Sequence, residues 1–133
     1  MKYLFFILFV FSLAACATQQ NVQIKELDPE EEKDSVTYEL IVLDPGFESW
    51  FISNSKPDWY HSQNYYESWN QRYVQAWNYH SFGTRYSQLL EGNINYDSQE
   101  DYGLEINHKL FYYFQYVVHV LKIPIIPDGP RSI

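Results

Sequence analysis

The residues whose types and spacing come closest to a chemical site are Glu105 and His108. They form a Glu-x-x-His pattern in a segment with helical periodicity, so both side chains would share one helix face, and Asp101 stands four residues before Glu105. Carboxylate-bridged metal centres in helix bundles need two such motifs together with further glutamates. The chain has no second copy of the motif, so a solvated polar face is the favoured interpretation, and no metal or cofactor is expected.

Other patterns of catalytic residues find little support in the sequence. The four histidines lack the spacing of a zinc site, and Cys16 is the one cysteine. The sequence has no serine nucleophile elbow and no glycine-rich phosphate loop. Asp44 and Glu48 form a carboxylate pair, but Asp44 precedes a proline and is expected to cap a helix. We therefore expect a protein that is not an enzyme.

Aromatic and amide side chains gather between residues 65 and 79, a mixture that is typical of sugar-binding sites. Those at three- and four-residue spacing are expected to face the core of a helix. Tyr65, Asn70 and Tyr79 remain candidates for ligand binding if a face of this helix is exposed, and Glu105 and His108 are separate speculative ligand-binding residues on the third helix. A glycan or peptidoglycan binder that uses this second helix is therefore the alternative functional hypothesis.

Cys16 ends an apolar N-terminal stretch, in the order LAAC at residues 13–16, after a basic start at Lys2. A basic start, an apolar run and small residues before the cut are the parts of a secretory signal. A cysteine directly after the cut resembles the signals of bacterial lipoproteins, which implies removal of residues 1–15 and lipidation of Cys16. The apolar run is shorter than the roughly 20 residues of a spanning helix, so a retained anchor, like a coincidental cysteine, is less favoured.

Charge and anchoring indicate which partners to expect. The whole chain has a formal charge of −8, and removal of the leader with Lys2 lowers it to −9, which argues against nucleic acid. The expected contacts are a membrane, through a lipid anchor on Cys16, and an envelope protein. Ala17 stands where an aspartate retains some lipoproteins at the inner membrane, so the outer membrane is favoured. The periplasmic and the surface face both stay open.

Composition divides the mature chain into three parts. Residues 16–36 are polar and acidic and are expected to form a flexible linker after the lipidated cysteine. Residues 37–123 carry the apolar periodicity of a small folded domain, rich in aromatic side chains that are expected to form its core. Residues 124–133 contain three prolines and are expected to be extended or loose.

Periodicity predicts the elements of the domain. A strand over residues 37–43 is followed by a short helix over 44–56 and by a longer helix over 62–80. Residues 93–96 are expected to pair with the first strand, and a third helix is expected over 98–123, with Ser98 and Asp101 as its capping box. This order indicates an α+β domain in which three helices pack on a small two-stranded antiparallel sheet. Gly103, inside the third helix, is expected to allow the close approach of an aromatic ring.

Three blocks of the sequence stand out by their order and spacing: YELIVLDPGFESWF at residues 38–51, YHSQNYYESWNQRYVQAWN at residues 60–78 and DYGLEINHKLFYYFQY at residues 101–116. Together with the N-terminal signal, they resemble a family of small Bacteroidota lipoproteins whose function is unknown. The resemblance implies an anchored envelope protein and supplies no catalytic residue. The preferred hypothesis is a non-enzymatic lipoprotein that contacts another protein or supports an envelope complex.

Overall fold

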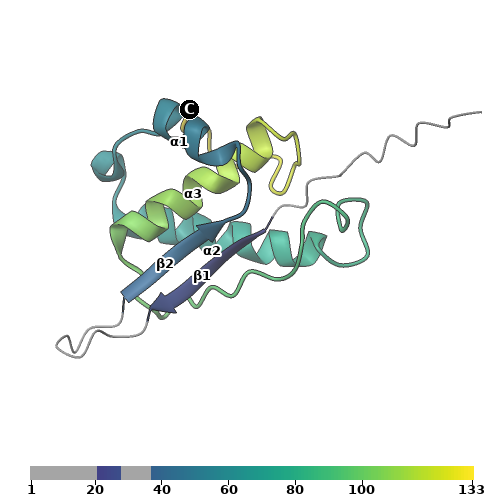
Figure 1. Cartoon of the computed structure of the whole chain (residues 1–133), viewed down its shortest axis with the longest axis horizontal. Coiled ribbons are helices and arrows are strands. Elements are labelled where there is room, and N and C mark those ends of the chain that lie inside the picture. The colour runs from purple at the N-terminus through teal and green to yellow at the C-terminus, as the bar shows by residue number, and fades with distance from the viewer. Residues whose placement is uncertain (1–20, 28–36) are drawn as a thin grey trace, which may run out of the picture.

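The computed structural model of the chain describes residues 21–27 and 37–133 (Figure 1). Within these residues it contains the strands β1 (Val22–Leu27) and β2 (Thr37–Val42), the α-helices α1 (Phe47–Asn54), α2 (Gln63–His80) and α3 (Gly103–His119), and the 3-10 helix η1 (Asp58–Tyr60). The expected α+β class, with three α-helices and a two-stranded antiparallel sheet, is confirmed. The proposed leader and Cys16 lie outside the described residues.

The partner of β2 differs from the one that periodicity predicts. β1 pairs antiparallel with β2, with Val22 opposite Val42, whereas residues 93–96 have no strand geometry. The linker expected over residues 16–36 therefore contains a strand at residues 22–27, and that part of the prediction is wrong. The acidic residues of the predicted linker dominate its composition. They obscure the short alternation of a strand, in which the Val22 side chain is buried and that of Gln23 is exposed.

The start of α3 also differs from the prediction. α3 begins at Gly103, and its N-cap residue Tyr102 makes no side-chain capping bond, so the capping box of Ser98 and Asp101 is wrong. Gly103 has a φ of +81°, and nothing lies within 4 Å of where a Cβ would be. Glycine is therefore needed here for its left-handed backbone and not for the approach of an aromatic ring.

The two long helices lie side by side and run in the same direction. Contacts join Gln63 to Asp101, two residues before α3, and join Asn70 to Asn107 and Trp77 to Phe114. The partner number rises along α3 as the residue number rises along α2, which is the order of a parallel pair. Residues 81–102 form the long connection that returns along the sheet from the end of α2 to the start of α3 (Figure 1).

α3 is the central element of the core. It contacts α1, α2, β2 and η1, and every residue from Leu110 to Val117 is buried. A helix stretch that is buried on all sides must be enclosed by other elements. The fully buried aromatic residues confirm the expected aromatic core: Phe47, Tyr66, Tyr73, Trp77, Phe111, Tyr112, Tyr113 and Phe114.

The C-terminal tail helps to enclose α3, so the expectation of a loose tail is wrong. Ile125 is buried, and the Tyr112 hydroxyl donates a hydrogen bond to the Ser132 carbonyl over 3.0 Å. Gly129 lies so close to the Tyr73 hydroxyl that a side chain at this position would clash.

In residues 21–27 and 37–133, no helix combines the length and the apolarity that crossing a membrane requires.

Candidate functional site

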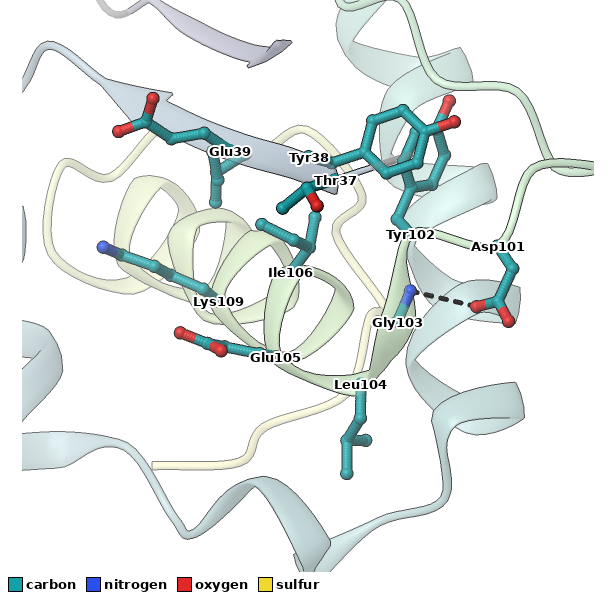
Figure 2. A pocket seen from close by; sticks show the side chains of 11 residues that line it. Thr37, Tyr38, Glu39, Asp101, Tyr102, Gly103, Leu104, Glu105, Ile106 and Lys109 are labelled. Atoms are coloured by element: carbon teal, nitrogen blue, oxygen red, sulfur yellow. Dashed lines mark hydrogen bonds between the residues drawn. The ribbon is translucent and has the colours of Figure 1, made fainter. Parts of the chain in front are cut away.

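A groove runs between β2 and the beginning of α3 (Figure 2). It has a volume of about 530 Å³ and is lined by residues 37–40 on the strand side and by residues 101–106 and Lys109 on the helix side. Figures 1 and 2 both place α3 on the side of β2 that faces away from β1. Because the sheet in the described residues has the two strands β1 and β2, the edge of β2 toward this groove has no strand partner.

Carboxylates surround the groove and an adjoining hollow beside β1. They are Glu26, Glu39, Asp97, Glu100, Asp101 and Glu105, and we call this region the acidic end. Lys25 stands opposite Glu39 in the sheet register, and Lys109 Nζ lies 2.6 Å from Glu48 Oε1. Both nearby lysines thus already face a carboxylate, and the acidic end keeps an excess of negative charge.

Asp101 is fixed at the rim of the groove by two hydrogen bonds. Its Oδ1 accepts from the Gly103 N–H over 3.0 Å and from Gln63 Nε2 over 2.7 Å. The first contact satisfies an amide at the start of α3 that has no partner within the helix. The second contact joins the starts of α2 and α3, so this wall of the groove is held from both helices.

Tyr38 joins the strand side of the acidic end to the connection that precedes α3. Its hydroxyl donates to Glu100 Oε2 over 3.0 Å, and its ring packs edge-on against Tyr102 with centroids 4.7 Å apart. Burial and the hydrogen bond to the carboxylate raise the pKa of Tyr38 to about 12. The hydroxyl therefore stays protonated at neutral pH and acts as a hydrogen-bond donor.

The structure separates Glu105 from His108. Glu105 is exposed and lines the groove, whereas the His108 side chain is buried and its Nε2 donates to the Lys56 carbonyl over 2.7 Å. Burial lowers the pKa of His108 below its usual value, so the ring is neutral at pH 7. Across the described ranges, no three His, Cys, Asp or Glu side chains are grouped so as to hold a metal ion.

The three candidates on the second helix do not form one surface. Asn70 is fully buried, and its Nδ2 donates to the backbone and side-chain oxygens of Asn107 over 2.8 and 3.2 Å. Its role is to join α2 to α3, so the suggestion that it contacts a ligand is wrong. Tyr65 is half-buried and stacks on His61 with centroids 3.9 Å apart. Tyr79 is 73% exposed but lies at the other end of α2.

Reasoning from the sequence missed the strand side of the groove. Tyr38 and Glu39 have no assigned role there, because the periodicity of residues 37–43 predicts a strand and says nothing of what lies beside its edge. A signal for the helix side was present, since Glu105 and Lys109 are four residues apart in a segment with helical periodicity and so share a helix face. Their meeting with β2 depends on tertiary packing, which that spacing does not encode.

Comparison with known proteins gives a family without an activity. No curated protein and no solved structure matches the chain. A family model matches residues 3–125, a range that includes both strands, the three α-helices and the lining of the groove. The chain therefore belongs to the family of unknown function DUF6146.

Proposed function

We propose that this protein is a lipid-anchored bacterial envelope protein that binds a partner protein and has no catalytic activity of its own. The anchor is supported by the order of the N-terminal residues, in which an apolar run ends at LAAC, with Cys16 as the acceptor of the lipid. Two or more acyl chains hold a protein stably on a membrane without a spanning helix. The outer membrane is the favoured location.

The observation that carries the binding proposal is the groove between the unpaired edge of β2 and the start of α3. A strand edge presents free backbone N–H and C=O groups to which an extended segment of another chain can pair. The adjacent carboxylates Glu39 and Glu105 are exposed, and attract positive charge. The partner that fits this chemistry is an extended segment that carries Lys or Arg side chains.

The polar groups of the groove support binding more than catalysis. Asp101 is held by the Gly103 amide and by Gln63, and Lys109 is paired with Glu48. A general acid or base has to be free to exchange a proton with a substrate. What the groove leaves free is negative charge and a strand edge.

Replacement of Cys16 tests the anchor. In cells that produce the full chain, the wild-type protein should incorporate a labelled fatty acid and sediment with the outer membrane. Cys16→Ser should lose the label and move to the soluble fraction. A wild-type protein that stays unlabelled, or a Cys16→Ser variant that still incorporates the fatty acid, would contradict the proposal.

A photo-crosslinking amino acid at Thr37 tests the groove. Thr37 is exposed and lines the groove, so illumination of cells should produce a discrete adduct with the partner. The double substitution Glu39→Lys and Glu105→Lys should remove the adduct. The control Glu91→Lys with Asp128→Lys makes the same change in charge at exposed positions outside the groove and should keep it. Lack of an adduct, or equal loss in both double variants, would overturn the groove as the binding site.

A further inference from the structure

The distance from the lipid anchor to the folded domain is short. Cys16 is five residues before Asn21, the residue that precedes β1. A fully extended chain advances at most about 3.6 Å per residue, so this segment spans at most about 18 Å. If Cys16 carries lipid, as we propose above, the end of the domain at which β1 begins is held close to the bilayer.

The strand residues next to this point of entry are known from the register of the sheet. β1 begins where β2 ends, and the Leu43 N–H donates to the Asn21 carbonyl over 3.1 Å. Leu43 is therefore adjacent to the entry of the chain, and it is 62% exposed. An apolar side chain beside the tether is thus open to its surroundings.

Both long helices finish toward the same end of the molecule. Figure 1 shows the beginning of β1, the end of β2 and the C-terminal ends of α2 and α3 toward the right of the view. Tyr79 in the last turn of α2 is 73% exposed, Phe82 just after this helix is 69% exposed, and the α3 C-cap residue Val120 is 43% exposed. We call Leu43, Tyr79, Phe82 and Val120 the entry end.

We propose that the entry end rests on the lipid bilayer, with its exposed apolar side chains in the membrane interface. Tyrosine is enriched at this depth because its ring is apolar and its hydroxyl is polar, and Leu, Phe and Val gain free energy by leaving water. Arg85 is exposed in the segment after α2, and Lys122 is exposed in the segment after α3. Both side chains can contact lipid phosphates. Glu91, in the same segment as Arg85, is an acidic neighbour.

The charges at the two ends favour this orientation over its reverse. The acidic end lies where β1 finishes and where β2 and α3 begin, which is opposite to the entry end. Turning the acidic end toward lipid phosphates would bring like charges together. The short tether and the charge distribution therefore both place the bilayer at the entry end, and the groove points away from it.

Site-specific fluorescence on the full lipoprotein tests this orientation. Since Cys16 is the one cysteine and its thiol would carry lipid, a second cysteine can be labelled selectively with an environment-sensitive fluorophore. Phe82→Cys places the label at the entry end, and Trp59→Cys is the matched control because Trp59 is 73% exposed and lies on η1. Each lipoprotein is extracted from membranes and reconstituted into vesicles of phosphatidylethanolamine and phosphatidylglycerol that contain a nitroxide lipid as quencher.

We expect the label at position 82 to shift to the blue and to be quenched at least about twofold more than the label at position 59. Equal quenching at the two positions in vesicles that float with the protein would overturn the orientation and leave the anchor standing. Failure of the wild-type lipoprotein to float with the vesicles would overturn both proposals. A further pair of lipoproteins carries the label on Tyr79→Cys, one with and one without the substitutions Leu43→Ser and Phe82→Ser. Both should float with the vesicles, but the substituted protein should lose the quenching of its label. Unchanged quenching of the label at position 79 would also contradict the orientation.

Discussion

The two ends of this domain differ in the charged and apolar groups that reach their surfaces. At the acidic end, hydrogen bonds join the elements, as between Gln63 and Asp101 and between Tyr38 and Glu100. Toward the entry end, aromatic side chains fill the space between the same two helices, with Trp77 packed on Phe114. One pair of helices thus has a polar, charged end and an end at which apolar side chains reach the surface.

The parallel course of α2 and α3 explains much of this difference. Both helices expose their free N–H groups at the acidic end, where a helix dipole favours negative charge. Glu105 lies in the first turn of α3, and the Asp101 carboxylate accepts a hydrogen bond from the Gly103 amide, the first amide of this helix. The last turns of α2 and α3 carry His80 and His119 instead. The charge asymmetry of the molecule therefore follows the direction of its helices.

The largest expected effect tests the aromatic half of this comparison. Trp77 is fully buried, and its Nε1 donates to the Gly92 carbonyl over 3.0 Å. Trp77→Ala should lower the free energy of unfolding by about 3–5 kcal/mol through the cavity it leaves. The exposed Trp59→Ala should change it by less than about 0.5 kcal/mol. Urea unfolding followed by circular dichroism measures both, and similar losses would show that Trp77 is not part of a packed core.

A polar residue between the helices tests the other half. Asn107 Oδ1 accepts from Tyr96 and from Asn70, and its Nδ2 donates to the Gly103 carbonyl. Asn107→Ala should cost about 2 kcal/mol, because it leaves buried donors without acceptors. Asn64→Ala, at an exposed position of α2, is the control and should have little effect in the same urea titration. A loss no greater than that of the control would mean that the hydrogen bonds do not hold this end together.

Substitutions of Gly103, at the start of α3, should lower the free energy of unfolding by a smaller amount. Gly103→Ala places a Cβ on a left-handed residue and should cost about 1 kcal/mol, although no neighbouring atom obstructs it. Gly103→Asn should cost less, because asparagine tolerates this conformation better than alanine does. Thermal unfolding of the two variants separates strain from crowding. A larger loss for asparagine than for alanine would favour crowding.

The smallest effect compares the histidines of α3. Burial lowers the pKa of both His108 and His119 in the folded protein. The unfolded chain therefore takes up protons first as the pH falls below about 6.5, and the stability that the neutral rings contribute is lost below that pH. His108→Gln should flatten the fall in unfolding free energy between neutral and mildly acidic pH more than His119→Gln does, because His108 is the more buried. Equal slopes would contradict this ranking.

The helices could be predicted from the sequence because their apolar side chains carry their own period. Tyr66, Tyr73 and Trp77 recur along one face of α2, and all three are buried. β1 could not be identified in the same way, since a short strand next to an acidic run has too few apolar residues to dominate its segment. The packing of the C-terminal tail could not be predicted either. Its prolines indicate an irregular backbone, but they do not indicate which residues this backbone contacts.

The candidate site was only half accessible to the same reasoning. The spacing of Glu105 and Lys109 places them on one helix face, but only the packing of α3 beside β2 turns that face into a wall of the groove. His108 shows the reverse case. Its spacing from Glu105 suggests a shared helix face, yet its side chain is buried. Its ring is hydrogen-bonded to the Lys56 carbonyl and packs against the rings of Phe51 and Tyr66.

The connection over residues 81–102 has a consequence for how the chain folds. Two antiparallel helices joined by a short turn can pair progressively from that turn, whereas α2 and α3 meet only after the connection has returned to the start of the pair. The entropy of closing this loop is lost before any contact between the helices can form. A domain that is mostly helical thus has a core built from sequence-distant contacts, which are typical of slowly folding mixed topologies.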